Sequence, residues 1–227
     1  MIFNLVFNIF LPIFILQKGN AYFNPTQTLL LALLFPLIYG VYDYLKNKHK
    51  NYISLLGILN VALTGGLALS GLNGIWFAIK EASFPLLIGA FVLASSFTEN
   101  PLIKTFFLNP QFFNVELIHQ KVIEFKKEQD FLIHLRKSTQ FLSFSFLISS
   151  ILNFVLALYF FKPISETLSA EEKSTLLNAQ IAQMTSWSYL VIMAPSMLIL
   201  FFVLKYVFKG LKDLTGLTFE EIAKATT

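Results

Sequence analysis

Two charged residues, Lys80 and Glu81, stand side by side inside the apolar stretch "GIWFAIKEASFPLLIGAFVLASSF". A lysine and a carboxylate inside a membrane-length segment can bind a polar ligand, carry a proton or serve as a tolerated edge feature. Counted from Ile75, Lys80 lies about 7 Å below the outer end of a helix, a depth from which a lysine can snorkel. Because helical neighbours point about 100° apart, we expect the two groups not to pair closely. Glu81 would then need another partner, a wet cavity or a proton.

The composition indicates that the solvent of this chain is lipid. Only 13% of the 227 residues are charged and 56% are hydrophobic, whereas a soluble domain carries about 25% charged residues. Five segments are long and apolar enough to cross a bilayer: residues 26–45, 51–70, 75–97, 138–161 and 185–208. A sixth, residues 1–16, is short, and a cleaved signal peptide is the rival interpretation. Since no basic region precedes its apolar run, we expect a retained first helix that spans or is partly re-entrant.

These segments predict an all-α fold, a polytopic membrane helix bundle of about six transmembrane helices that forms one domain over residues 1–227. Thirteen of the 17 Lys and Arg residues then fall on one side, which the positive-inside rule assigns to the cytoplasm. Both termini are therefore expected in the cytoplasm, and the protein in a bacterial inner membrane. Asp43 is expected at the inner end of the second span as a membrane-edge charge, within reach of Lys46.

Two segments outside the predicted spans have helical character. Residues 111–137 carry apolar side chains at three- and four-residue steps, which predicts an amphipathic helix or helix pair at the inner surface; these are Ile118, Val122, Phe125, Leu132 and Leu135. Residues 169–184 predict an outer helix that begins with a Ser169–Glu172 capping box and continues toward the last span. Gly216 can end the last long helix, and Thr218 with Glu221 can cap a final short one.

Small and kink-forming residues inside the spans suggest how the helices pack. Ala62, Gly66 and Ser70 share one face of a helix, where small residues let a second helix approach closely. Thr64 in the same span is a plausible interhelical hydrogen-bond donor. Four prolines, Pro12, Pro36, Pro85 and Pro195, fall inside spans and predict kinks. Broken helices are typical of transporters, although proline is also common in membrane helices generally.

The sequence offers no constellation typical of catalysis. It has no cysteine, which excludes disulfides and thiolate metal sites. His49, His119 and His134 lack metal spacing, and a solvated face explains the last two. No phosphate loop, nucleophile elbow or metalloprotease motif occurs. We therefore expect no enzyme, no catalytic residue, no cofactor and no metal, and the scattered basic residues predict no nucleic-acid partner.

The order of several segments resembles the bacterial intracellular septation protein A family. The resemblance covers about residues 1–108 and depends on "FLPIFIL", the basic "YDYLKNKHK", a small-residue span, "WFAIKEA" and "NPLIK". A related set of proteins sometimes labelled as transporters matches further, through "SFLISSILNFVLA" and "LKDLTGLTFEEI". The resemblance implies a non-enzymatic role in envelope integrity, cell division or membrane-lipid balance. Its implied partners are membrane lipids, other inner-membrane proteins or further copies of the chain. The alternative is a small-molecule transporter or lipid flippase with a polar pocket near Lys80, Glu81 and Pro85.

Overall fold

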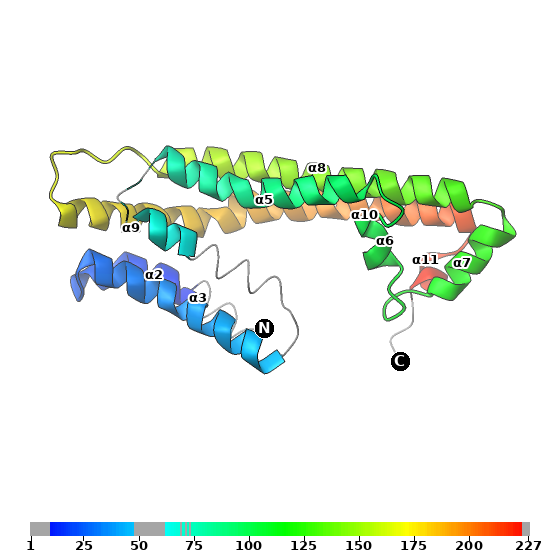
Figure 1. Cartoon of the computed structure of the whole chain (residues 1–227), viewed down its shortest axis with the longest axis horizontal. Helices are drawn as coiled ribbons and strands as arrows, with labels where there is room; N and C mark the ends of the chain where they lie inside the picture. The colour runs from blue at the N-terminus through cyan, green and yellow to red at the C-terminus, as the bar shows by residue number, and fades with distance from the viewer. Residues whose placement is uncertain (1–9, 48–61, 69, 71, 73, 224–227) are drawn as a thin grey trace. The chain divides into compact units, whose positions relative to one another are not determined.

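The computed structural model describes residues 10–47, 62–68, 70, 72 and 74–223. Over these residues the fold is all-helical, as predicted, with no strand and one isolated β-bridge between Phe113 and Ala223. In chain order the elements are α2 (Leu11–Lys18), η2 (Gly19–Ala21), α3 (Pro25–Asn47), α5 (Ile75–Ser95), α6 (Leu102–Phe107), α7 (Val115–Glu124), α8 (Glu128–Phe160), α9 (Ala170–Ser188), η3 (Tyr189–Met193), α10 (Ala194–Thr215) and α11 (Phe219–Ile222) (Figure 1). Residues 62–68 are also helical.

Four helical stretches of the described chain are long and apolar enough to cross a membrane. They are Pro25–Tyr42, Ile75–Ser95, Glu128–Phe160 and Ala170–Thr215, and they contain or closely match the predicted spans at 26–45, 75–97, 138–161 and 185–208. Of the predicted spans at 1–16 and 51–70, residues 1–9 and 51–61 lie outside the described residues. The chain is therefore a helical membrane protein with four such stretches in its described part.

One of these stretches is longer than the sequence predicted. The 33 residues of α8 contain neither glycine nor proline, so the polar residues 128–137 and the apolar residues after them form one helix. At 1.5 Å per residue it is about 50 Å long, against about 30 Å for the hydrocarbon core. As predicted, the outer helix continues into the last span, because α9, η3 and α10 form one continuous helical stretch from Ala170 to Thr215.

A π-helical turn, η3, interrupts the last stretch just before Pro195. Pro195 has no N–H for the carbonyl of Val191, and its ring would collide with that carbonyl in a regular helix. The wider π turn over Tyr189–Met193 accommodates the ring without ending the helix. Pro36 and Pro85, in contrast, lie inside α3 and α5 without such a turn.

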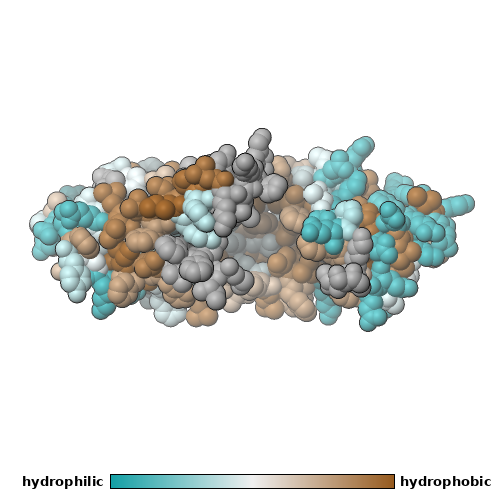
Figure 2. Space-filling view, turned by 90° about the horizontal axis from the view of Figure 1, so that it is seen from below, coloured by the Kyte–Doolittle hydropathy of each residue, from teal (hydrophilic) through white to brown (hydrophobic). Residues whose placement is uncertain are grey.

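The chain divides into two compact units, residues 1–82 with 152–192 and residues 83–151 with 193–227. Continuous helical stretches contribute to both units, and each unit has its own apolar core. The first core contains Leu16, Leu29, Ala32, Phe77, Ala78, Leu156, Ala157, Phe161, Leu177, Ile181, Ala182 and Met184. The second contains Ile103, Ile118, Val122, Phe131, Leu135, Val203, Val207, Leu211, Leu217 and Ile222. Hydrophobic residues are also exposed over much of one face (Figure 2), as expected of lipid-facing helices.

The segment at 111–137 is a helix pair, α7 and the first turns of α8. Ile118, Val122 and Leu135 are buried, in agreement with the predicted apolar face. The two helices are separated by residues 125–127, where Lys126 adopts φ 55°. Phe125 in this turn is 46% exposed, so it does not join the core of its unit.

The predicted helix caps are confirmed. Ser169 and Glu172 form a capping box at the start of α9, and Thr218 and Glu221 form one at α11. Gly216 ends α10 with φ 71°, a left-handed conformation that glycine adopts without strain.

Candidate functional site

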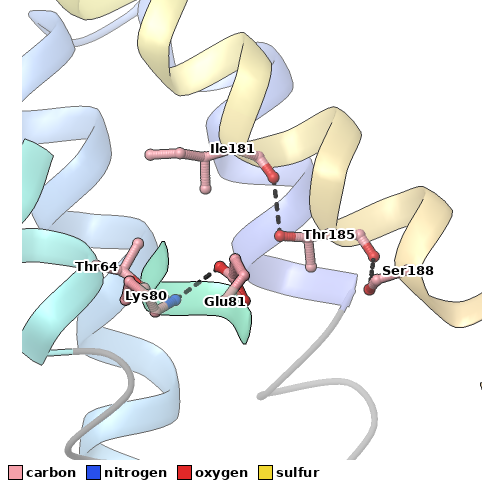
Figure 3. A network of polar contacts seen from close by, with 6 residues as sticks. All are labelled: Thr64, Lys80, Glu81, Ile181, Thr185 and Ser188. Carbon is pink, nitrogen blue, oxygen red and sulfur yellow. Dashed lines mark hydrogen bonds and ion pairs between the residues drawn. The ribbon is translucent and has the colours of Figure 1, made fainter. Parts of the chain in front are cut away.

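Lys80 of α5 is a buried charged side chain in the first unit, with 7% of the residue exposed. Its Nζ donates a hydrogen bond to Oγ1 of Thr64 at 2.8 Å and to Oε1 of Glu81 at 2.7 Å (Figure 3). The Lys80–Glu81 pair is thus an ion pair inside a helix of membrane length. Thr64, from the helical residues 62–68, thus accepts a second hydrogen bond from the ammonium.

Two predictions about this pair were wrong. The neighbours do pair closely, because the 100° divergence applies to the Cα–Cβ bonds and the four methylenes of lysine can curve back to the carboxylate. Lys80 also does not snorkel to an exposed position. The hydroxyl of Thr64 supplies a second acceptor within the bundle, so the ammonium is bonded without leaving it. Thr64 acts in this bond as the acceptor, whereas the sequence suggested a donor.

The two charged groups differ in burial. The Lys80 side chain is 6% exposed and the Glu81 side chain 24%. One of the three N–H groups on Nζ, and Oε2 of Glu81, have no hydrogen-bond partner among the described residues. The ammonium of Lys80 is therefore buried, while the carboxylate of Glu81 is partly exposed. Each group can make one more hydrogen bond.

The surroundings of the pair on α9 are polar but uncharged. Figure 3 draws Ile181, Thr185 and Ser188 in the same network as the pair. The Thr185 hydroxyl donates to the Ile181 carbonyl, and the Ser188 hydroxyl to the Thr185 carbonyl, each at 2.8 Å. The sequence analysis did not single out these hydroxyls, whose only signal is a three-residue spacing on a helix.

Pro85 follows Glu81 by four residues in α5. A proline has no N–H, so the carbonyl of Glu81 lacks the donor that a regular helix would supply at this position. The backbone next to the carboxylate is therefore more polar than that of an uninterrupted helix.

The predicted packing stripe does not pack within the described chain. Ala62, Gly66 and Ser70 are exposed, and open space surrounds the position of a Cβ on Gly66. The buried face of this helix instead contains Thr64 and Gly65, where a Cβ on Gly65 would lie 2.8 Å from Cδ1 of Leu33. A contact between this stripe and a further helix therefore stays a prediction, while the bond from Lys80 reaches Thr64 on the buried face.

Two other candidate positions have different outcomes. Asp43 lies near the end of α3, as predicted; its side chain is outside the described part, so its pairing with Lys46 stays a prediction. His134 was expected on a solvated face, which is wrong. Its Nε2 lies 3.2 Å from the carbonyl of Val207, and a Cβ on Gly210 would overlap its ring. His119 is exposed.

No group of three His, Asp or Glu side chains in the described part is placed to hold a metal ion. Lys80 and Glu81 do not line the cavity between α5 and α8 around Gly89, the cavity around Gly19, or the cavity at the start of α9, all of which are formed by described residues. No family model, curated protein or solved structure matches this chain.

Proposed function

We propose that this chain is a non-catalytic, multi-pass protein of a bacterial inner membrane that acts through membrane lipids. The observation that carries the proposal is the buried Lys80–Glu81 pair in α5. A buried ion pair is commonly no more stable than apolar side chains of the same volume. Ionisable groups at membrane depth are therefore expected to be retained for function.

The resemblance to the septation protein A family supports a role in envelope integrity, cell division or membrane-lipid balance. The aliphatic and aromatic side chains exposed on α5 and α10 give lipids or other membrane proteins a contact surface; these include Leu87, Phe91, Phe201 and Phe202. Further copies of this chain are the other partner of suitable chemistry.

The proposed topology has six spans with both termini in the cytoplasm. Reporter fusions after Phe97 should then report the cytoplasm, and fusions after Lys162 the opposite side. An external signal at Phe97 would contradict the topology, because six of the thirteen basic residues assigned inside follow this position before α8 enters the apolar stretch.

Complementation of a deletion strain tests the proposed function. Glu81→Gln and Lys80→Met each remove one charge with little change in volume, and we expect both to reach the membrane yet fail to restore growth or lipid composition. Glu171→Gln is the matched control, since Glu171 is exposed in the first turn of α9. Full restoration by both pair variants, measured together with membrane-lipid profiles, would contradict a functional role for the pair.

A second candidate is a small-molecule transporter or lipid flippase. It is favoured by the partly exposed carboxylate of Glu81 and by Pro85 one turn later in α5, because the proline leaves the Glu81 carbonyl without its helical hydrogen bond and so adds a polar group beside the carboxylate. Lipid scrambling in proteoliposomes separates the two candidates. A rate that depends on Glu81 supports the flippase, and the rate of protein-free vesicles supports a non-transporting role.

A further inference from the structure

We propose that the cavity around Gly19, which Lys18 lines, binds one anionic phospholipid. The phosphate of this lipid lies beside Lys18, and part of one acyl chain covers the apolar lining. The cavity is formed by residues of α2, η2 and α3, all of them in the first unit. The inference rests on the proposed function, in which membrane lipids are the partner, and it names the class of lipid and a place where the lipid binds.

The cavity exists because small residues occupy the turn between α2 and α3. Leu16 of α2 and Leu29 of α3 are buried in the same apolar core, and the two helices pack against each other (Figure 1). The backbone of Gly19 approaches α3 so closely that a Cβ there would lie 2.8 Å from Cγ2 of Thr28. Neither Gly19 nor Ala21 has a side chain large enough to fill the space beside this contact, a cavity of about 380 Å³. Cavities that bind small molecules typically measure about 300–1,000 Å³.

The cavity has one charge, and that charge is positive. Lys18 is the only charged residue that lines it and the only Lys, Arg, Asp or Glu among residues 1–42 of the sequence. Within the part of the chain that the structure describes, no carboxylate forms an ion pair with Lys18. In the same unit Glu81 pairs with Lys80, and Glu172 accepts the hydrogen bonds of the capping box of α9. A cation without a counter-ion at the edge of a membrane span attracts anionic lipid.

The lining changes along the chain in the order in which a lipid changes from headgroup to tail. The candidate span of α3 begins at Pro25, and Lys18 and Tyr22 precede it, at the level where headgroups and aromatic side chains meet. Leu31 follows Pro25 by six residues, about 9 Å deeper at 1.5 Å per residue. Phe14 and Tyr22 are 63% and 84% exposed. The cavity is therefore open to its surroundings, and a lipid can enter it sideways from the bilayer.

An anionic phospholipid satisfies the charge and the apolar lining with a single molecule. Its phosphate can accept a charge-assisted hydrogen bond from the ammonium of Lys18, while its chain contacts Phe14 and Leu31. A zwitterionic lipid offers the same chains, but its own cation competes with Lys18 for the phosphate. One lysine near a membrane surface corresponds to about a fivefold preference for an anionic lipid.

Native mass spectrometry of the full chain in nonionic detergent can measure this preference. The chain is titrated with phosphatidylglycerol or with phosphatidylcholine of the same acyl chains. We expect one phosphatidylglycerol to bind at least about fivefold more tightly than phosphatidylcholine. Lys18→Gln should abolish the preference and leave the affinity for phosphatidylcholine unchanged. Equal affinity of the wild type for the two lipids, or a preference that survives Lys18→Gln, would overturn the proposal.

Lys162→Gln is the matched control for the charge. Lys162 is also exposed and has an aromatic neighbour, since its Nζ lies 5.2 Å from the ring centroid of Tyr159, but it does not line the cavity. The preference for phosphatidylglycerol should persist in this variant. Loss of the preference in Lys162→Gln as well as in Lys18→Gln would show that net charge is responsible, and would overturn a site at the cavity.

Ala21→Trp tests the apolar part of the site. Ala21 is exposed and lines the cavity, so a tryptophan can fill the space without entering the core. Both lipids should then bind about tenfold more weakly, a loss that corresponds to fewer than two methylene groups giving up their contact. Unchanged affinity for both lipids would show that no acyl chain occupies the cavity. Lys18→Gln changes only an exposed side chain, so the test of the charge stands even if the tryptophan lowers the stability.

The same variants separate the lipid from a second copy of this chain. A dimer in lipid-free detergent that Ala21→Trp dissociates would assign the cavity to a second copy and overturn the lipid site. The failure of the site can also be told from the failure of the proposed function. If phosphatidylglycerol shows no preference, while Glu81→Gln and Lys80→Met still fail to complement the deletion strain, the lipid site is wrong and the proposed function stands.

Discussion

The unequal burial of the Lys80–Glu81 pair predicts unequal costs for removing either partner. The cost of breaking a buried pair belongs mainly to the charge that is left behind. Glu81→Gln leaves the ammonium of Lys80, whose side chain is 6% exposed, and should destabilise the protein by about 3–5 kcal/mol. Lys80→Met leaves a carboxylate that is 24% exposed and can bind water, so we expect about 2 kcal/mol, mostly the lost charge-assisted bond.

The double variant Lys80→Met/Glu81→Gln removes both charges and should lie within about 1 kcal/mol of the wild type, since neutral replacements of a buried pair are often tolerated. The cycle would then give a coupling free energy of at least about 4 kcal/mol, far above the error of additivity between independent sites. Thr64→Val would cost about 1 kcal/mol, the net value of one hydrogen bond.

Steric trapping in lipid bicelles can measure these free energies, because the chain has no cysteine and accepts an engineered, biotinylated pair without interference. Trp76 and Trp187, on α5 and α9, report the unfolding by fluorescence. Additive single-variant effects, or a greater cost for Lys80→Met than for Glu81→Gln, would refute the inference from burial.

Three further predictions concern other parts of the chain. Gly210→Ala should destabilise the protein by about 1–3 kcal/mol in the same trapping assay, since the added Cβ overlaps the ring of His134. Gly66→Ala is the control, because open space surrounds Gly66, and it should be neutral or stabilising. Equal effects of the two substitutions would contradict the packing of His134 against Gly210. Hydrogen bonds from the Thr218 N–H and hydroxyl hold the pKa of Glu221 below its usual value. Because the pKa of Glu221 is lower in the folded state, this cap should stabilise α11 at a pH above the unfolded pKa and weaken as the pH falls through the folded pKa. The weakening would be seen as faster amide exchange in α11, relative to the intrinsic exchange rate at each pH. Unchanged relative exchange would contradict the prediction. Phe125→Cys should react readily with a water-soluble maleimide, whereas protection of this position would place the turn against lipid.

The local features of the fold were the most predictable from sequence. Both capping boxes join residues three positions apart, and the left-handed glycine at the end of α10 needs no partner elsewhere in the chain. Membrane-length helices likewise follow from length and composition alone. The extent of α8 was underestimated because its polar first turns look like a separate surface segment, although no residue between Glu128 and Phe160 breaks the helix.

The candidate site was predictable in its residues but not in its geometry. The sequence identified Lys80 and Glu81, yet it could not show that Thr64, sixteen residues earlier, accepts a bond from the ammonium. That bond also selects the inward face of residues 62–68, which a four-residue repeat of small side chains cannot do. His134 is a similar case. Periodicity places it on a polar face, but its ring packs against Gly210, which lies on a helix about 75 residues later in the chain.

The core of the second unit has a consequence for biosynthesis. Ile118, Val122 and Leu135 come from α7 and α8, whereas Leu211 and Ile222 follow much later in the chain, in α10 and α11. The hydrogen bond that joins the two parts, from the Asn114 N–H to the Ile222 carbonyl at 2.9 Å, can form only after residue 222 has been translated. Until then the apolar face of α7 has no partner from α10 or α11, and a transient binder such as a chaperone or the lipid surface would have to cover it. A ribosome stalled shortly before residue 211 should therefore yield a chain in which α7 is sensitive to protease, although the preceding membrane helices have already been inserted.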